Sequence, residues 1–367
     1  MDKEDLLYLI ALLKTENIGP VLAKNLIQSL GGIKAVFQAS KRELMMIPKI
    51  GEKTSKDLTY IHQNLSEAEK IIKQCEKLGI SILSYQCDEY PSILKEIYDP
   101  PLILYYKGFL SDKTWGIGVV GTRAITDYGK EQTKILTEYL VQNQVIIVSG
   151  MAYGVDYQAH RTCIDLKART LGILACGIDT IYPKSHENLA VEIILQGGAI
   201  VSEYPPGAKV NPMNFPLRNR IISGLSKAVV IVESGEQGGA LITAQFAFEQ
   251  NREVWAIPGR ITDKKSLGCN LLIQKNIAKI YTKPSDVLED LKIPLEKPIK
   301  PQAQPLFLEL SPVEECIYRN LDFQGMEIET LKEITQLETN TLLSSLLSLE
   351  IKGLIIQLPG KKILKKQ

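Results

Sequence analysis

Arg218, Asn219 and Arg220 form the group of side chains in this chain that is best suited to bind a ligand. The fixed fork of N–H donors on a guanidinium matches two phosphate oxygens, so paired arginines on a firm scaffold are good phosphate ligands. The triplet precedes the apolar residues 221–225, and a buried strand is expected soon afterwards, at 228–232. Two interpretations stay open from this segment alone. The arginines bind a phosphate-bearing partner, or they cap a helix and pair with nearby carboxylates.

Short apolar runs recur between residues 115 and 290, and helical stretches separate most of them. Continuously apolar strands are buried on both faces, which is typical of a parallel sheet between two helix layers. We therefore expect an α/β domain over 66–290 with an extended Rossmann-like, doubly wound and mostly parallel sheet. Its expected strands are 116–120, 145–148, 170–175, 199–201, 228–232, 253–257 and 279–281.

Small and basic residues follow the carboxyl ends of these strands. Ligands bind such sheets outside those ends, where glycine lets ligand atoms reach backbone N–H groups and helix N-termini. Several such turns on consecutive strands are hard to explain as turn chemistry alone, so we expect a phosphate-bearing ligand there. The candidate residues are Gly121, Thr122, Arg123, Ser149, Gly150, Lys184, Arg218, Asn219, Arg220, Gly238 and Gly239.

Residues 1–65 are expected to form a helical domain of helix-hairpin-helix or SAM-like type. Two similar motifs, centred on Gly19 and Gly51, each place a glycine after an apolar residue and before a helix. In helix-hairpin-helix modules, N–H groups at the start of that helix can meet a phosphate. The helix after the second motif is expected at 55–65, and this motif is either a DNA contact or a hairpin packed for structure alone. It carries three lysines, Lys49, Lys53 and Lys56.

Residues 291–305 contain four prolines and three lysines, the composition of a semi-rigid linker. Beyond it, helices are expected at 312–321, 328–335 and 341–352. With a hairpin at 353–364 around Pro359 and Gly360, they predict a winged-helix domain over 306–367. Such domains usually bind DNA through the last helix. That helix has no arginine here, so a protein-contact role stays open.

The composition limits the class of protein. The net charge is +1, so any nucleic-acid site must concentrate its positive charge locally. No apolar run approaches the about 20 residues that span a bilayer, and the acidic N-terminus is unlike a signal peptide. The six cysteines have no C-x-x-C pair and the three histidines are far apart, so we expect reduced thiols, no metal and a cytoplasmic protein.

Motifs for catalysis are incomplete. Neither the ordered glycines of a dinucleotide site nor a P-loop is present. His160 has no visible acid–base partner, and we expect it to be a packed or capping histidine. Glu203 and Glu233 end strands and are either general acids or anchors for the arginines, which sequence does not decide because geometry comes first.

Taken together, these motifs resemble the DNA-processing protein A family (DprA, also called Smf). The resemblance runs from about residue 60 to residue 283, and the two flanking domains fit it less specifically. One departure is at 238–241, which reads Gly-Gly-Ala-Leu where the family more often has a Ser-Gly-Ser-Leu type of sequence, so a small residue stands where a hydroxyl is common. The resemblance lies in Tyr90-Pro91, Pro100-Pro101, residues 121–123, 149–156 with Ala159-His160, 177–179 with Tyr182-Pro183, 202–207, 215–220, and Pro258-Gly259 with 268–270.

The resemblance implies a non-enzymatic, dimeric and cytoplasmic protein without cofactors. Such a protein binds single-stranded DNA, shields the incoming strand in natural transformation and loads the RecA recombinase onto it. The candidate residues would then contact the DNA backbone, with little preference for sequence.

Two other functions stay open. A nucleotide-processing enzyme of the phosphoribohydrolase type has a related fold, but residues 234–241 do not complete its Pro-Gly-Gly-x-Gly-Thr-x-x-Glu signature. A scaffold whose strand-end glycines contact only proteins is the third hypothesis.

Overall fold

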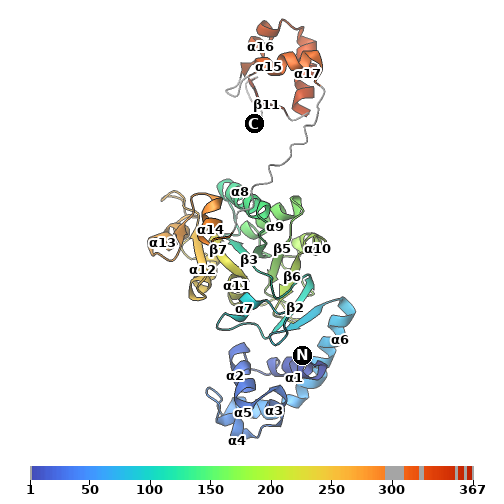
Figure 1. Cartoon of the computed structure of the whole chain (residues 1–367), viewed down its shortest axis with the longest axis vertical. Coiled ribbons are helices and arrows are strands. Elements are labelled where there is room, and N and C mark those ends of the chain that lie inside the picture. Colours follow the sequence, from blue (N-terminus) through green and yellow to red (C-terminus); the bar gives the residue numbers. More distant parts are fainter. Residues whose placement is uncertain (1, 294–309, 322–325, 352–353, 359–361, 366–367) are drawn as a thin grey trace. The chain divides into compact units, whose positions relative to one another are not determined.

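A computed structural model of the chain describes residues 2–293, 310–321, 326–351, 354–358 and 362–365. The chain divides into two compact units, Met1–Lys297 and Pro298–Gln367, which are described separately (Figure 1). All four prolines of the expected linker lie outside the described residues. The domain boundaries expected at residues 65, 290 and 305 stay predictions.

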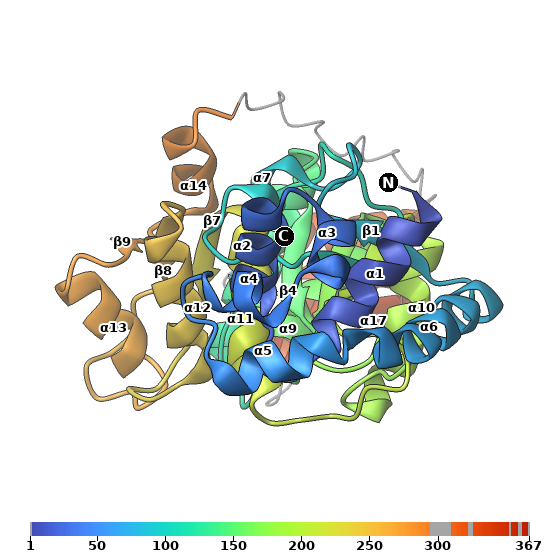
Figure 2. The ribbon, with the colours of Figure 1, turned by 90° about the horizontal axis from the view of Figure 1, so that it is seen from below.

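The first unit begins with a group of helices around a common apolar core (Figure 2). Residues such as Leu9, Leu12 and Leu26 are almost fully buried there, because the apolar positions recur at helical spacing. The helix expected at 55–65 begins earlier, at Glu52, and ends at Thr59, where Tyr60 leaves the helical conformation. The elements are α1 (Lys3–Leu13), α2 (Pro20–Leu30), α3 (Ile33–Gln38), α4 (Lys41–Met45), α5 (Glu52–Thr59), the 3₁₀ turn η1 (Ile61–Asn64) and α6 (Leu65–Leu78).

The two glycine motifs form matching hairpins. Gly19 and Gly51 each precede a helix with an extended backbone. Two residues earlier, Asn17 and Lys49 both have positive φ, of 63° and 70°. The first hairpin packs toward the sheet, where Lys24 Nζ donates to Tyr85 Oη at 3.2 Å. In the second hairpin all three lysines are exposed, and DNA contact by it stays a prediction.

The sheet of the first unit has nine strands in the order β1-β2-β6-β5-β4-β3-β7-β8-β9. It is parallel except where β2 pairs with β1 and with β6, so the expected doubly wound, mostly parallel sheet is confirmed. The strands are β1 (Ser81–Ser84), β2 (Ile103–Gly108), β3 (Gly116–Val120), β4 (Ile147–Gly150), β5 (Thr170–Leu174), β6 (Ala199–Ser202), β7 (Ser226–Ile231), β8 (Glu253–Ala256) and β9 (Lys279–Ile280).

Helices cover both faces of this sheet (Figure 1). On one face lie α8 (Asp127–Gln142), α9 (Val155–Asp165) and α14 (Pro284–Asp290), with α10 (Glu187–Leu195) against α9. On the other face lie α7 (Ser92–Lys95), α11 (Asn214–Gly224), α12 (Gly239–Glu249) and α13 (Leu267–Gln274). Successive residues of β7 alternate between the two cores, which explains its unbroken apolar sequence.

The central strand β3 lies between β4 and β7 and pairs in parallel with both. The chain builds β3 to β6 outward on one side, then returns beside β3 and builds β7 to β9 on the other. The strand order therefore reverses at β3, and the carboxyl ends of β3, β4 and β7 frame the crevice in which such sheets bind ligands.

The second unit has the helices and wing that the sequence predicts. Its helices are α15 (Pro312–Asn320), α16 (Ile328–Thr335) and α17 (Thr339–Ile351), around a small apolar core. The strands β11 (Ile355–Leu358) and β12 (Lys362–Lys365) pair antiparallel, and the expected turn at Pro359 and Gly360 lies outside the described residues. A third strand, β10 (Met326–Glu327), was not predicted, because two residues carry no alternating pattern.

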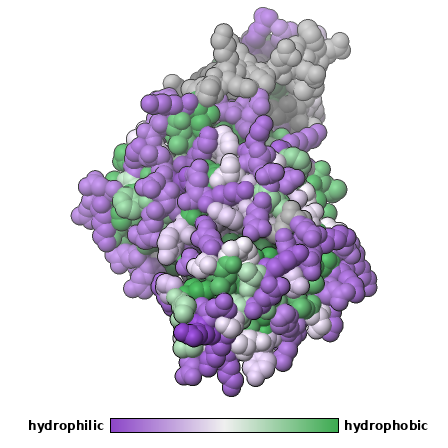
Figure 3. All heavy atoms as spheres, turned by 60° about the horizontal axis from the view of Figure 1, so that its bottom comes forward, coloured by the Kyte–Doolittle hydropathy of each residue, from purple (hydrophilic) through white to green (hydrophobic). Residues whose placement is uncertain are grey.

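Hydrophilic residues cover most of the face drawn in the space-filling view, and hydrophobic residues form small groups on it (Figure 3). No helix among the described residues is long and apolar enough to cross a membrane. The same residues contain no cluster of three or more side chains that could hold a metal ion. All six cysteines are free; four are buried, while Cys87 is half-buried and Cys316 is exposed.

Candidate nucleic-acid interface

A pocket of about 490 Å³ opens at the crevice beside the carboxyl end of β3. Strand ends, the start of α12 and one side of α11 surround it. Its lining includes Gly121, Thr122, Arg123, Ala152, Asp156, Tyr182, Phe215, Arg218, Asn219, Ser234, Gly235, Gly238, Gly239 and Thr243.

The turn after β3 forms one wall. The N–H of Thr122 donates to the Glu233 carbonyl at 2.8 Å, which fixes this turn against the end of β7. A Cβ at Gly121 would lie 2.5 Å from Val155 Cγ2, so only glycine lets α9 approach so closely. Arg123 is exposed, and its guanidinium lies 5.5 Å from the centre of the Phe215 ring. Arg123 therefore offers N–H donors at the mouth of the pocket.

Arg218 contributes the buried positive charge. It lies on α11 with 6% of its surface exposed. Its Nη1 donates to the Ile173 carbonyl, and its Nε donates to Asn219 Oδ1 at 3.2 Å. These bonds hold the guanidinium in one orientation at the base of the pocket. A buried cation with fixed N–H groups attracts an anionic ligand more strongly than an exposed one.

Asp156 carries the opposing charge near Arg218. It lies on the first turn of α9 and lines the same pocket. Burial raises the pKa of this carboxyl to about 6, although the neighbouring Arg218 charge opposes that shift. Its Oδ2 also accepts the Ala152 N–H at 3.3 Å. Near neutral pH the carboxylate offsets part of the arginine charge, and in mild acid it no longer does.

Gly150 and Ser149 lie beneath the pocket rather than in its lining. A Cβ at Gly150 would lie 2.5 Å from Asp156 Oδ2 and 2.7 Å from Arg218 Nη2, so this glycine makes room for the buried charges. The Ser149 hydroxyl is fully buried and donates to the Val119 carbonyl at 2.6 Å. Both predicted residues therefore shape the base of the pocket.

Arg220 lies away from this pocket. Its Nε donates to Asp99 Oδ2 at 2.9 Å and its Nη2 to Glu203 Oε1 at 2.7 Å. Only 3% of its surface is exposed. The structural pairing that the sequence left open thus applies to Arg220, and Glu203 is the anchor.

The start of α12 closes the far side of the pocket. Gly238 precedes the helix with an extended backbone, and no side chain caps the helix there. The first N–H groups of an α-helix have no partner within the helix, so they can bind an anion. A Cβ at Gly238 would collide with Ser234 Oγ, whereas one at Gly239 would meet nothing within 4 Å. Position 238 therefore suits a glycine, because the Ser234 hydroxyl occupies the space that a side chain at 238 would need.

The pocket brings together seven of the eleven predicted residues and leaves out Ser149, Gly150, Arg220 and Lys184. Lys184 is exposed on the 3₁₀ turn η2 (Lys184–His186). The sequence reasoning did not select Asp156, Tyr182 and Phe215, which also line the pocket. All three stand within the motifs already noted. For Phe215 the available signal was an aromatic residue three positions before Arg218.

His160 and Glu233 also have partners within the fold. His160 is fully buried between Thr170 Oγ1 and the Gly150 carbonyl, each 2.8 Å from a ring nitrogen. Burial lowers its pKa to about 4, so it is a packed, neutral histidine as expected. The Glu233 carboxylate is buried and accepts hydrogen bonds from the Thr126 N–H, at 2.9 Å, and from its hydroxyl. It secures the start of α8.

The fold and the pocket define a class: a Rossmann-like domain with a guanidinium-lined pocket at its topological switch point, followed by a winged-helix domain. The family model of DNA recombination-mediator protein A matches residues 81–292, and the model of the DprA winged helix domain matches residues 300–361. This chain belongs to the DNA-processing protein A (DprA/Smf) family, as the motifs indicate.

Relatives and solved structures agree. Protein Smf of Synechocystis is 32% identical over 390 residues, covering 97% of each chain. DNA processing protein DprA of Bacillus subtilis is 40% identical over 63% of this chain and 78% of its own. The crystal structure of Streptococcus pneumoniae DprA has a TM-score of 0.65 at 31% identity, covering 77% of this chain and 97% of that one.

A second solved structure is of DNA processing protein A from Helicobacter pylori, described by its single-stranded DNA binding mode. It has a TM-score of 0.52 at 28% identity and covers 58% of this chain and 95% of that one.

Proposed function

We propose that the pocket binds the backbone of single-stranded DNA. The observation that carries the proposal is that two guanidiniums and an uncapped helix N-terminus converge on one opening at the switch point of the sheet. Phosphate oxygens match all of these donors. The relative from Helicobacter pylori, described as a single-stranded DNA binder, supports the choice of nucleic acid.

The predicted residues would have different roles in DNA binding. Arg123 at the mouth and Arg218 at the base would each neutralise a phosphate, and Asn219 would orient Arg218. N–H groups at Gly121 and Gly239 would hold phosphate oxygens, while Thr122 and Gly238, whose N–H groups donate to the Glu233 and Gly235 carbonyls, would shape the turns beside them. Gly150 and Ser149 would act through the shape of the pocket, and Arg220 would hold α11 through Asp99 and Glu203. Lys184 would contact the strand outside the pocket. Because these are mainly backbone contacts, base sequence should matter little.

The deciding experiment is a titration of fluorescent single-stranded and double-stranded oligonucleotides over a range of salt concentrations. The single strand should bind more tightly, and its affinity should fall steeply with salt as counterions are released. Arg123→Ala should weaken binding to oligonucleotides of any sequence. Equal affinity of the variant and the wild type would contradict DNA binding by this pocket.

We further propose that the chain is a cytoplasmic homodimer that protects incoming DNA in natural transformation and loads RecA onto it. Family membership supports this role. Its test is RecA ATPase activity on single strands coated with single-strand-binding protein. The wild type should shorten the lag before hydrolysis and Arg123→Ala should not, while sedimentation measures the dimer. A wild type that leaves the lag unchanged would contradict RecA loading without affecting DNA binding.

We propose that the chain binds nucleic acid without catalysis, metal or cofactor. The bonds from Thr126 to Glu233 support this view, because they engage the carboxylate that a phosphoribohydrolase would need free. The alternative predicts release of a base from nucleoside monophosphates by the purified protein, abolished in Glu233→Gln. Such release would favour the enzyme.

A further inference from the structure

Exposed aromatic side chains lie beside the pocket as well as in its lining. Tyr153 is 51% exposed, Tyr157 39% and Tyr182 46%. Arg123, Tyr182 and Phe215 line both the pocket and a smaller adjoining hollow, and Tyr153 lines that hollow as well. The hollow that Tyr153 lines is therefore continuous with the pocket at Arg123 and Tyr182.

Tyr153, Tyr157 and His186 form a compact group, here called the aromatic shelf. The ring centres of both tyrosines lie 4.9 Å from that of His186. His186 is buried, and its Nδ1 lies 2.9 Å from the Met151 carbonyl. The Tyr153 hydroxyl lies 3.0 Å from Ser185 Oγ. The histidine thus supports two tyrosines that are each partly open to solvent.

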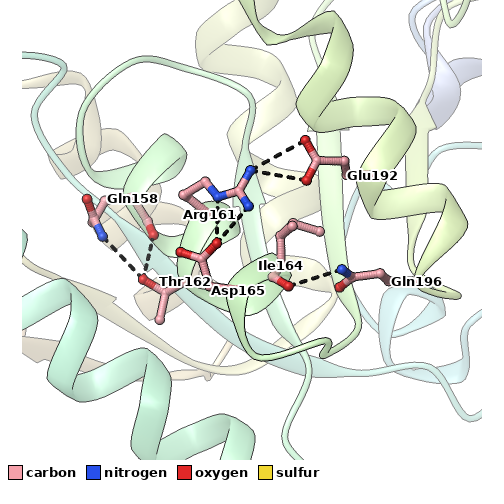
Figure 4. A network of polar contacts seen from close by, with 7 residues as sticks. All are labelled: Gln158, Arg161, Thr162, Ile164, Asp165, Glu192 and Gln196. Atoms are coloured by element: carbon pink, nitrogen blue, oxygen red, sulfur yellow. Dashed lines mark hydrogen bonds and ion pairs between the residues drawn. The ribbon is translucent and has the colours of Figure 1, made fainter. Parts of the chain in front are cut away.

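The elements beneath the shelf are tied together (Figure 4). Tyr157 lies on α9, and α10 begins one residue after His186. Arg161 joins these helices, since its Nη1 lies 3.1 Å from Glu192 Oε2 while its Nε donates to Asp165 at 2.9 Å. Gln196 donates to the Ile164 carbonyl at 3.0 Å. The shelf is therefore held in place before a ligand arrives, which lowers the entropic cost of binding.

Positive charge accompanies the shelf. Lys184 is exposed one residue before Ser185, whose hydroxyl meets Tyr153. Within the described residues Lys184 and Arg123 make no ion pair. Aromatic rings beside free cations are the combination by which proteins bind single strands without sequence preference, because every base has a face that can stack. An apolar protein partner would not need these charges.

We propose that the aromatic shelf stacks the bases of the DNA segment that leaves the pocket past Arg123, while Lys184 neutralises the adjacent phosphate. The proposal rests on the proposed function of the pocket. It also assigns a role to Lys184, which does not line the pocket. In this arrangement the pocket binds the DNA backbone, and the aromatic shelf contacts the bases.

The test compares a single-stranded oligonucleotide with an abasic strand of the same length, at fixed salt. The wild type should bind the oligonucleotide about tenfold more tightly than the abasic strand, because bases stack only where they are present. In Tyr153→Ala/Tyr157→Ala this ratio should fall several-fold while the abasic affinity is unchanged. Tyr153→Phe/Tyr157→Trp should restore the ratio, and Tyr98→Ala, at a residue 80% exposed elsewhere, should leave it unchanged.

The outcomes separate the two proposals. If the double variant keeps the wild-type ratio while Arg123→Ala weakens binding to both strands, the shelf is wrong and the pocket stands. If the wild type binds neither strand, both proposals fail. Tryptophan fluorescence during urea unfolding shows whether each variant is folded, since both tryptophans, Trp115 and Trp255, belong to the α/β domain.

Discussion

Arg218 and Arg220 lie on opposite sides of helix α11. Successive side chains of an α-helix are rotated by about 100° around its axis. Two side chains that are two residues apart are therefore separated by roughly 200°. Arg218 lines the pocket at the end of β3, and Arg220 is bound by Asp99 and Glu203 in the direction of the N-terminal helices. Two arginines that look equivalent in the sequence therefore have different tasks.

The first prediction separates these tasks. Arg218→Ala should weaken single-strand binding about tenfold, as expected for loss of a charged hydrogen-bond donor. Arg220→Ala should lower the free energy of unfolding by about 3 kcal/mol, because it leaves two carboxylates without their partner. Urea unfolding and fluorescence anisotropy measure the two quantities. The reverse ranking, with Arg220→Ala as the weaker binder and the more stable of the two, would contradict the assignment.

The second prediction concerns the number of phosphate contacts. Arg123 is exposed and makes no ion pair among the described residues. Arg123→Ala should therefore leave the free energy of unfolding unchanged. It should reduce the slope of log affinity against log salt by about one unit, since one counterion fewer is released. Lys113→Ala, at an exposed lysine that precedes β3 and makes no ion pair among the described residues, is the matched control. A slope unchanged in Arg123→Ala would exclude a phosphate contact.

The third prediction compares two glycines of the site. A Cβ at Gly150 would lie within 2.8 Å of both the Asp156 carboxylate and the Arg218 guanidinium, whereas one at Gly239 would meet nothing within 4 Å. Gly150→Ala should lower the free energy of unfolding by about 2 kcal/mol, as overpacking does. Gly239→Ala should leave it within about 0.5 kcal/mol. Equal losses in both variants, measured by urea unfolding, would argue against the crowding of Gly150.

The fourth prediction concerns pH. The pKa of Asp156 is about 6, so acidification from pH 7.5 to 5.5 protonates it and leaves the Arg218 charge without compensation. Single-strand affinity should rise roughly fivefold over this range. Asp156→Asn should already bind with that affinity at pH 7.5 and depend less on pH. Any effect of His186, whose pKa burial lowers, would remain in this variant. Asp88→Asn, at an exposed carboxyl, should behave as the wild type.

The same shift affects stability with a definite sign. Because the carboxyl pKa is higher in the folded chain than in the unfolded one, its contribution favours folding at low pH. That contribution is lost as pH rises from about 4 to about 6. The difference in free energy of unfolding between Asp156→Asn and the wild type should therefore grow over this interval. A constant difference would mean that the pKa of Asp156 is not raised.

Much of the sheet could be predicted from the sequence because its strands are buried on both faces. Gly116 to Val120 and Glu253 to Ala256 appear where the apolar runs indicate them. The third strand of the winged helix could not be predicted, since Met326 and Glu327 are held by pairing with Ile363 and Lys362 and not by a local pattern. Strand order and the position of the switch point also depend on pairing between distant segments.

The sequence by itself determined which residues gather at the ends of the strands, because glycines and arginines at these positions need no tertiary information to be recognised. It also placed Arg218 and Arg220 in one motif. Only the tertiary structure decided that they diverge. In an extended segment, residues two apart point to the same side, but α11 is helical and turns one arginine into the pocket and the other toward Asp99 and Glu203. Burial and partners across the fold, which no local pattern encodes, decided their roles.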